Sequence, residues 1–216
     1  MGRKSTKNNL ENMTNLTCYI LWHDDSKWSN IPDLPYLVNV NLSNLPIGDF
    51  QRNTFSESRF FLHNAKMNDY VGNLTASWNT KYNNLIPLNR LCDLEFKPNI
   101  VWAACKNLYP NWFNLQVKTA IRMHNMLCPF FKQYPDGPSL WANNFLCSRE
   151  VYEDFILVWR KVFAIVCKRI DLCIPYGIAP NDSNRKMGYI GELITLMYFA
   201  SRKDLEIKQI PKNTAT

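Results

Sequence analysis

The sequence predicts an α/β fold, with a mostly parallel (mixed) central sheet flanked by helices. Short β-branched and aromatic runs alternate with segments of helical periodicity through much of the chain. Alternation of this kind is typical of a sheet whose two faces are covered by helices. The length of 216 residues suits a single domain, and a hydrophobic content of 46% suffices for its core.

Five segments are predicted to be strands. Residues 17–22 form a β-branched and aromatic run that ends in a polar cluster, and residues 36–42 alternate in a similar way. Residues 69–77 and 99–105 have few polar interruptions, as expected of inner strands. A short fifth strand is predicted over residues 143–147.

Capping residues, and apolar residues that recur every 3–4 positions, predict the helices. Thr54-Phe-Ser-Glu57 has capping-box spacing, which predicts a helix over about 55–65. Apolar spacing predicts another helix over 111–127. Ser148 is a good N-cap for a long amphipathic helix, and a last helix is expected over about 187–202. The predicted buried stripe of the long helix is Phe155, Trp159, Val162, Phe163, Val166 and Ile170.

The predicted organisation is a disordered basic and Asn-rich arm over 1–15, one α/β domain over 16–205 and a flexible basic tail over 206–216. No apolar stretch reaches the ~20 residues that span a bilayer, and the N-terminus lacks the apolar core of a signal peptide. We therefore expect a cytoplasmic protein with reduced cysteines. Gly2 and Thr6 fit the loose N-myristoylation pattern, which leaves peripheral membrane attachment open.

Missing motifs exclude several enzyme classes. The sequence has neither Gly-x-Gly-x-x-Gly nor a Walker loop, which excludes Rossmann dehydrogenases and P-loop ATPases. It has no Gly-x-Ser-x-Gly elbow, and its three isolated histidines do not form His-Glu-x-x-His. Hydrolases that depend on these two motifs are excluded as well.

Polar residues near the ends of predicted strands are the first candidates for a site, because ligands of α/β sheets bind at the carboxyl ends of strands. Asp24 and Asp25 follow the first strand and have the chemistry to hold a divalent cation or a sugar hydroxyl. An exposed loop is the alternative explanation of this pair. Asp69 opens a strand, where a carboxylate either caps a neighbouring helix or contacts a ribose.

Two later clusters add an amide pair and an acid. Asn143 and Asn144 follow Trp141, and paired amides beside an indole suit a hydroxyl-rich ligand, although a simple turn would use the same residues. Glu192 shares a face of the last helix with Gly188 and Thr195. An acid in this apolar setting is a candidate general base, and a favourable interaction with the helix dipole is the alternative.

The order of these segments resembles a family of compact GT-A-like glycosyltransferases of bacterial surface-polysaccharide gene clusters and of some large viruses and phages. The resemblance covers about residues 50–200 and depends on order and spacing more than on any one motif. The segments that carry it are Phe55-Ser-Glu-Ser-Arg-Phe-Phe-Leu-His63, Asp69-Tyr-Val-Gly-Asn-Leu-Thr-Ala-Ser-Trp78-Asn-Thr-Lys-Tyr82, Asn143-Asn-Phe-Leu-Cys147, the helix from Ser148, and Gly188-Tyr-Ile-Gly-Glu192.

The resemblance implies a GT-A-like single domain that transfers a sugar from a nucleotide-sugar donor to a glycan or other acceptor. Glu192 would be the general base of an inverting reaction. The residues that it implies for the donor are Glu57, Arg59, His63, Asp69 and Trp78, and those for the acceptor are Trp141, Asn143 and Asn144.

The chain departs from the GT-A pattern at the metal site. It contains no Asp-x-Asp, the motif that normally holds Mn²⁺ or Mg²⁺ on the donor diphosphate. Asp24 and Asp25 are the candidate metal ligands in its place. The family's His-Tyr-Arg-Arg after the Tyr-Val-Gly strand is also replaced, by Thr-Ala-Ser-Trp-Asn. Metal dependence and activity itself therefore stay open at this point.

Two other functions compete with transfer. A degenerate transferase fold would bind a sugar or a protein partner without turnover. A nucleic-acid-binding protein is suggested by the net charge of +7, a pI of about 9.0 and the content of 12 Phe, 10 Tyr and 7 Trp. The aromatic residues follow core periodicity and do not interleave with Lys and Arg, so nucleic-acid binding is the weakest of the three predicted functions.

Overall fold

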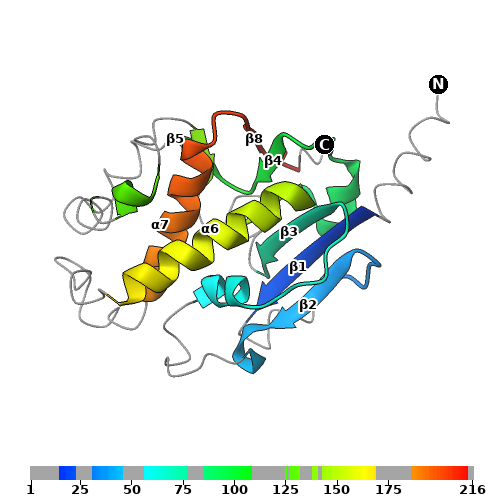
Figure 1. Ribbon diagram of the computed structural model, residues 1–216. Helices are drawn as coiled ribbons and strands as arrows, with labels where there is room; N and C mark the ends of the chain where they lie inside the picture. Colours follow the sequence, from blue (N-terminus) through cyan, green and yellow to red (C-terminus); the bar gives the residue numbers. More distant parts are fainter. Residues whose placement is uncertain are drawn as a thin grey trace.

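A mixed six-stranded sheet forms the centre of the fold (Figure 1). The computed structural model describes residues 15–22, 31–45, 56–76, 85–108, 125, 127–131, 138–140, 143–168 and 186–213. In spatial order the strands are β2 (Leu37–Asn41), β1 (Leu16–Trp22), β3 (Tyr70–Thr75), β7 (Phe145–Ser148), β4 (Ile100–Ala103) and β8 (Glu206–Gln209). β7 runs antiparallel to its neighbours β3 and β4, whereas the other paired strands are parallel. The predicted α/β class and mostly parallel mixed sheet are confirmed.

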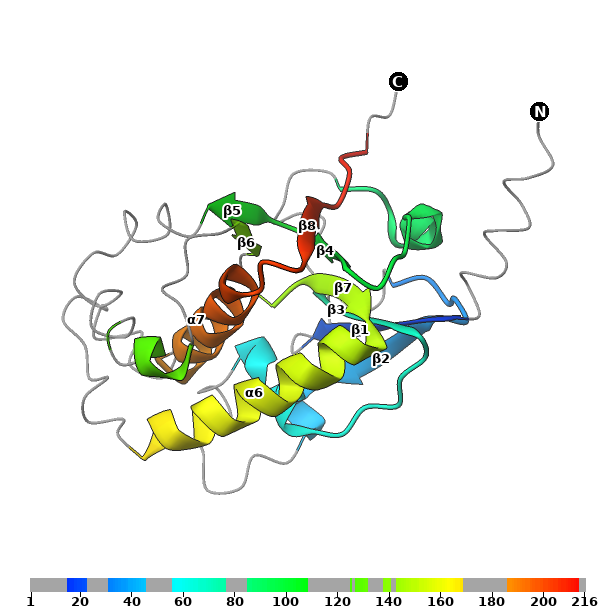
Figure 2. The same ribbon diagram turned by 45° about the horizontal axis from the view of Figure 1, so that its top comes forward.

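Both faces of the sheet are covered, because side chains of one strand alternate between two apolar clusters. In β1, Tyr19 and Leu21 face one cluster, and Cys18 and Ile20 face the other. The first face packs against the helices α6 (Arg149–Cys167) and α7 (Lys186–Ser201) and the 3₁₀ helix η2 (Ser56–Leu62). Figure 2 shows α6 and α7 side by side over this face. The 3₁₀ helix η3 (Leu88–Asp93) packs against the second face.

The two long helices begin and pack largely as predicted. The Ser148 hydroxyl accepts a hydrogen bond from the Val151 amide and so caps α6. The predicted stripe of α6 is buried from Phe155 to Val166, while Ile170 lies outside the described residues. From Ile190 to Ala200, α7 is buried at every position except Glu192, which is partly buried. A helix that is apolar on all sides is expected at the centre of a core.

Three segments differ from the sequence prediction. Residues 206–209 are not part of a flexible tail, because they form β8 at the edge of the sheet, where Ile207 is buried. The predicted helix over 55–65 is the shorter 3₁₀ helix η2. A second, two-stranded sheet pairs β5 (Lys106–Leu108) with β6 (Pro138–Leu140), which periodicity did not indicate.

The remaining described elements are two short 3₁₀ turns, η1 (Leu42–Asn44) and η4 (Cys128–Phe130). The predicted arm over 1–15 and the predicted helix over 111–127 fall almost wholly outside the described residues. None of the helices that the structure describes is long and apolar enough to cross a membrane.

Many of the aromatic side chains whose number suggested nucleic-acid binding lie in the core. Phe61 contacts Phe155 and Trp159 edge to face, with ring centroids 5.1 and 5.3 Å apart. Phe145 is also fully buried and packs against Phe199 at 4.9 Å. Because packing accounts for these rings, their number gives no support to a nucleic-acid surface.

Candidate functional site

One edge of the sheet collects the strand ends that the sequence analysis singled out. The parallel strands β1, β2, β3 and β4 end there, and the antiparallel strand β7 begins there. β2 and β3 lie on opposite sides of β1, so the strand order reverses at the carboxyl end of β1. In α/β sheets, ligands commonly bind at the carboxyl ends of the strands where the strand order reverses.

Asn143 is the centre of a buried hydrogen-bond network at this edge. Its side-chain Nδ2 donates to Ser58 Oγ at 2.9 Å, and its Oδ1 accepts from Thr195 Oγ1 at 2.7 Å. Its backbone carbonyl accepts a hydrogen bond from the side-chain amide of Asn73 in β3. Asn143 is 2% exposed, so this network joins η2, α7 and the sheet away from water.

Asn144 joins the carboxyl ends of β3 and β4 by hydrogen bonds. Its Oδ1 accepts a hydrogen bond from the backbone amide of Thr75 at 2.5 Å, and its carbonyl accepts one from the amide of Ala104 at 3.0 Å. Asn144 is fully buried. The sequence predicted acceptor contacts for Asn143 and Asn144. The side-chain amides of both residues bind protein groups in this structure, and their acceptor contacts stay a prediction.

Glu192 lies one turn from the buried network. Thr195 stands three residues further along the same side of α7 and is fully buried, whereas Glu192 is partly buried. Gly191 brings this part of α7 against η2, because an added Cβ would lie 2.3 Å from Ser58 Oγ. Trp159 Nε1 donates to the Gly191 carbonyl at 3.0 Å and fixes α7 against α6. Glu192 is therefore an acid on a tightly held helix beside the carboxyl edge of the sheet.

Two residues predicted to contact the donor, Arg59 and His63, make hydrogen bonds to other parts of the protein. Arg59 is 4% exposed, and its Nη2 donates to the Leu45 carbonyl at 2.7 Å, beyond the end of β2. The carbonyl of His63 accepts from Arg160 Nη2 at 2.7 Å, which ties the end of η2 to α6. Glu57 lies in the first turn of η2.

Asp69, predicted to cap a helix or to contact a ribose, lies at the amino edge of the sheet. It precedes the amino end of β3, and its carbonyl accepts a hydrogen bond from the Arg149 amide at the start of α6. Asn73, which contacts Asn143, lies toward the opposite end of the same strand. At about 3.3 Å per residue, the length of β3 places Asp69 ~20 Å from the carboxyl edge. The donor contact assigned to Asp69 stays a prediction.

Four predicted site residues lie outside the described residues: Asp24, Asp25, Trp78 and Trp141. Asp24 comes two residues after the end of β1, and Trp78 comes three residues after the end of β3. Within the described ranges, no group of three or more His, Cys, Asp or Glu side chains is placed to hold a metal ion. The metal-ligand assignment of Asp24 and Asp25 stays a prediction.

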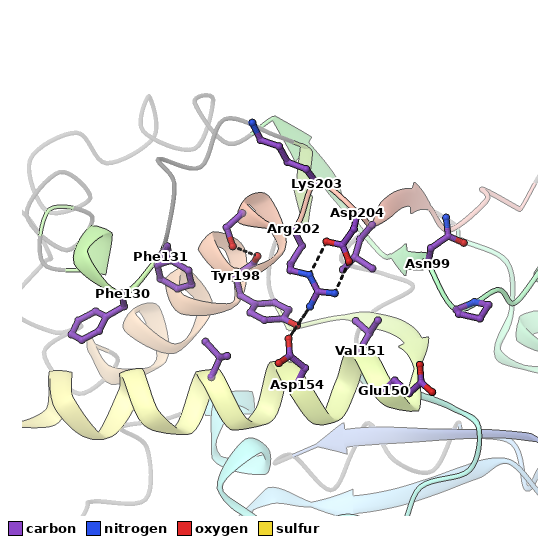
Figure 3. A pocket seen from close by; sticks show the side chains of 14 residues that line it. Asn99, Phe130, Phe131, Glu150, Val151, Asp154, Tyr198, Arg202, Lys203 and Asp204 are labelled. Atoms are coloured by element: carbon purple, nitrogen blue, oxygen red, sulfur yellow. Dashed lines mark hydrogen bonds and ion pairs between the residues drawn. The ribbon is translucent and has the colours of Figure 1, made fainter.

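A pocket of about 1050 Å³ lies at the opposite, amino edge of the sheet (Figure 3). Arg202 holds the centre of its wall, with Nε and Nη2 donating to Asp204 at 2.8 and 2.6 Å and Nη1 donating to Asp154 at 2.8 Å. Tyr198 donates its hydroxyl to Asp154 at 2.5 Å. We refer to Asp154, Tyr198, Arg202 and Asp204 as the Arg202 cluster.

Charge and burial change the acidities within the Arg202 cluster. The hydrogen bonds from Arg202 lower the pKa of Asp204, and the same hydrogen bonds raise the pKa of Arg202. Burial, with the hydrogen bond to Asp154, raises the pKa of the Tyr198 hydroxyl. The Arg202–Asp204 ion pair is therefore kept at neutral pH. The sequence analysis missed it, because Arg202 and Asp204 stood among the charges of the chain end and Asp154 on the polar face of a helix.

The comparisons with known proteins give one structural likeness. No family model matches the sequence, and no curated protein matches it either. The fold is similar to a solved structure described as the WbbM bifunctional glycosyltransferase in its apo form, with a TM-score of 0.56 and 12% sequence identity. The match covers 91% of this chain but 45% of that chain, so the present chain spans less than half of its neighbour's length. The likeness shows a glycosyltransferase-like fold.

Proposed function

We propose that the chain is a glycosyltransferase that moves a sugar from a nucleotide-sugar donor to a hydroxyl of an acceptor. The observation that carries the proposal is the position of Glu192. This acid stands on a helix held by the Thr195–Asn143 contact at the sheet edge where the strand order reverses. The likeness to a bifunctional glycosyltransferase structure supports the same conclusion at the level of the fold.

In this proposal the donor occupies the carboxyl ends of β1 and β3. Asp24 and Asp25 follow β1 in the sequence and Trp78 follows β3, and these two strands are neighbours in the sheet. The two carboxylates suit a divalent cation such as Mn²⁺ or Mg²⁺. Trp78 supplies an aromatic face for the base or the sugar.

Glu192 acts on the acceptor in this scheme. Its carboxylate takes the proton of the acceptor hydroxyl while the hydroxyl oxygen attacks the anomeric carbon of the donor sugar. The bond from that carbon to the diphosphate breaks, and the nucleoside diphosphate leaves with the electron pair. The positions of Asn143 and Asn144 support this role indirectly, because both hold the surrounding elements in place.

Turnover of nucleotide-sugars by the purified chain tests this proposal. We expect at least one UDP-, GDP- or dTDP-sugar to be consumed, with release of nucleoside diphosphate measured by a coupled assay. Glu192→Gln should lower turnover about tenfold or more and leave the thermal unfolding temperature unchanged. Glu153→Gln, which removes an exposed carboxylate on α6, is the matched control.

Two results would overturn the proposal. The first is normal turnover by Glu192→Gln, which would remove the assigned base. The second is the absence of both binding and turnover across all three donor classes. That outcome would favour a degenerate transferase fold that binds a sugar or a protein partner without catalysis.

A further inference from the structure

The geometry points to a second carbohydrate site, in the pocket at the amino edge of the sheet, which binds a neutral oligosaccharide. The role that we give it, holding a remote part of a glycan acceptor, rests on the proposed transferase function. Binding itself does not depend on that function. The pocket is distinct from the proposed transfer site. Arg202, in the pocket wall, directly follows the last residue of α7 and is ten residues beyond Glu192, so the two residues lie about 15 Å apart along the helix axis.

The charge of the pocket favours a neutral ligand. Among the lining residues that the structure describes, Glu150, Asp154 and Asp204 contribute three carboxylates, and Arg202 and Lys203 contribute two cations. Asp154 and Asp204 already bind the Arg202 guanidinium, through both of its Nη atoms and its Nε. A nucleoside diphosphate would therefore bring its negative charge to a wall that has a slight excess of carboxylates. An uncharged ligand avoids this repulsion.

The same groups are suited to sugar hydroxyls. Carboxylates accept hydrogen bonds in several directions, and within the described part of the chain both hydrogen bonds to Asp154 end on Oδ2. Its Oδ1 is thus an acceptor available to a hydroxyl donor. Glu150 and Asn99 lie on the side of the pocket where α6 and β4 begin, as Figure 3 shows. The ligand that these groups select is one that carries many hydroxyl donors.

Aromatic rings form the other side of the pocket. Phe130 and Phe131 line it at the end of η4, and Figure 3 shows them across the Arg202 cluster from Asn99. Flat aromatic faces beside a few polar groups are the usual construction of a small-molecule site. A sugar ring presents an apolar C–H face, which suits the aromatic side of the pocket, and polar edges, which suit the side with the carboxylates. The volume of about 1050 Å³ is large enough for a short oligosaccharide.

Binding of neutral trisaccharides to the full chain tests this inference. The probes are maltotriose, chitotriose and mannotriose, each followed by saturation-transfer NMR and by titration. We expect at least one of them to bind, and Phe131→Ala and Glu150→Gln each to raise its dissociation constant about tenfold. Val158→Trp fills the pocket from α6 and should abolish binding. Lys161→Ala, an exposed change on α6 outside the pocket, is the control.

The outcomes separate this inference from the proposed transferase function. Glu192→Gln should bind the trisaccharide as the wild type does, whatever its effect on turnover. Binding that is lost in Glu192→Gln but kept in the three pocket variants would place the ligand elsewhere and overturn the inference. Failure of all three trisaccharides to bind would also overturn it. Loss of trisaccharide binding in pocket variants that keep the wild-type unfolding temperature would support the carbohydrate site. If the wild-type chain then consumed no nucleotide-sugar, only the proposed transferase function would be contradicted.

Discussion

The hydroxyl of Thr195 donates a 2.7 Å hydrogen bond to the side-chain oxygen of Asn143. This contact joins the buried helix α7 to the residues that lead into β7, 52 positions earlier in the chain. Because Asn143 also donates to Ser58 in η2, a single amide holds three elements around the carboxyl edge of the sheet. The placement of Glu192 depends on this connection.

Replacement of Asn143 by leucine should destabilise the fold. The change removes the hydrogen bonds that join Asn143 to Ser58 and Thr195, at a cost of about 2 kcal/mol in the free energy of unfolding. Urea denaturation measures this loss, and Asn39→Ala, which removes an exposed amide from β2, should change stability little. Wild-type stability in Asn143→Leu would show that the network is not needed to hold the edge.

The close approach of α7 to η2 predicts that a side chain added at Gly191 destabilises the fold. In Gly191→Ala the new Cβ would lie 2.3 Å from Ser58 Oγ and 2.7 Å from Ser58 Cβ, so one of the two helices must move. We expect a loss of about 1–3 kcal/mol, measured by thermal or urea unfolding. The double variant Gly191→Ala/Ser58→Gly should recover part of that loss, because the clash partner is gone. Additive losses in the double variant would contradict the packing described here.

The ion pair between Arg202 and Asp204 predicts a pH-dependent contribution to stability. Hydrogen bonds from Arg202 lower the pKa of Asp204, so the stabilisation is present above the ordinary carboxyl pKa and is lost as the pH falls through the lower, folded-state pKa. Since Asp204 is largely exposed, Asp204→Asn should cost at most about 1 kcal/mol at pH 7.

Chemical denaturation across a pH series measures this contribution. The difference between wild type and Asp204→Asn should hold from neutral pH down to about pH 5 and shrink below about pH 4. Asp33→Asn, which removes an exposed carboxylate elsewhere, serves as the reference. A difference that grows as the pH falls would have the wrong sign for a carboxyl group of lowered pKa.

Two cysteines should be inert toward thiol reagents in the folded chain. Cys18 and Cys147 are fully buried in the sheet, and burial raises the pKa of both thiols above the ordinary value. Iodoacetamide followed by mass spectrometry should leave both unlabelled under native conditions and label both in urea. Native labelling at the rate seen in urea would show that the centre of the sheet opens readily.

Local signals predicted the two long helices and five strands of the central sheet, but not β8 or the β5–β6 pair. The N-cap Ser148 and the apolar stripe that follows it identify α6, because a 19-residue amphipathic helix repeats its pattern several times. β8 buries only Ile207 among charged neighbours, and so it looks like a solvated chain end. Its pairing with β4 is a tertiary contact that no local pattern records.

The site could be predicted only in part for a related reason. An amide pair such as Asn143 and Asn144 reveals a capacity for hydrogen bonds, but the sequence does not say whether protein or ligand uses it. Asp69 was correctly placed at the start of a strand, but whether its carboxylate contacts a ligand is not a property of the local sequence. The general position of Glu192 followed from helix periodicity, which is a local property.

A crystal structure of the chain with a bound nucleoside diphosphate, from whichever donor class it consumes, tests the central claim most directly. We predict that the diphosphate lies at the carboxyl ends of β1 and β3, with the Glu192 carboxylate facing the side from which an acceptor would approach. A diphosphate bound in the pocket around Arg202, or on a surface remote from Glu192, would contradict the account.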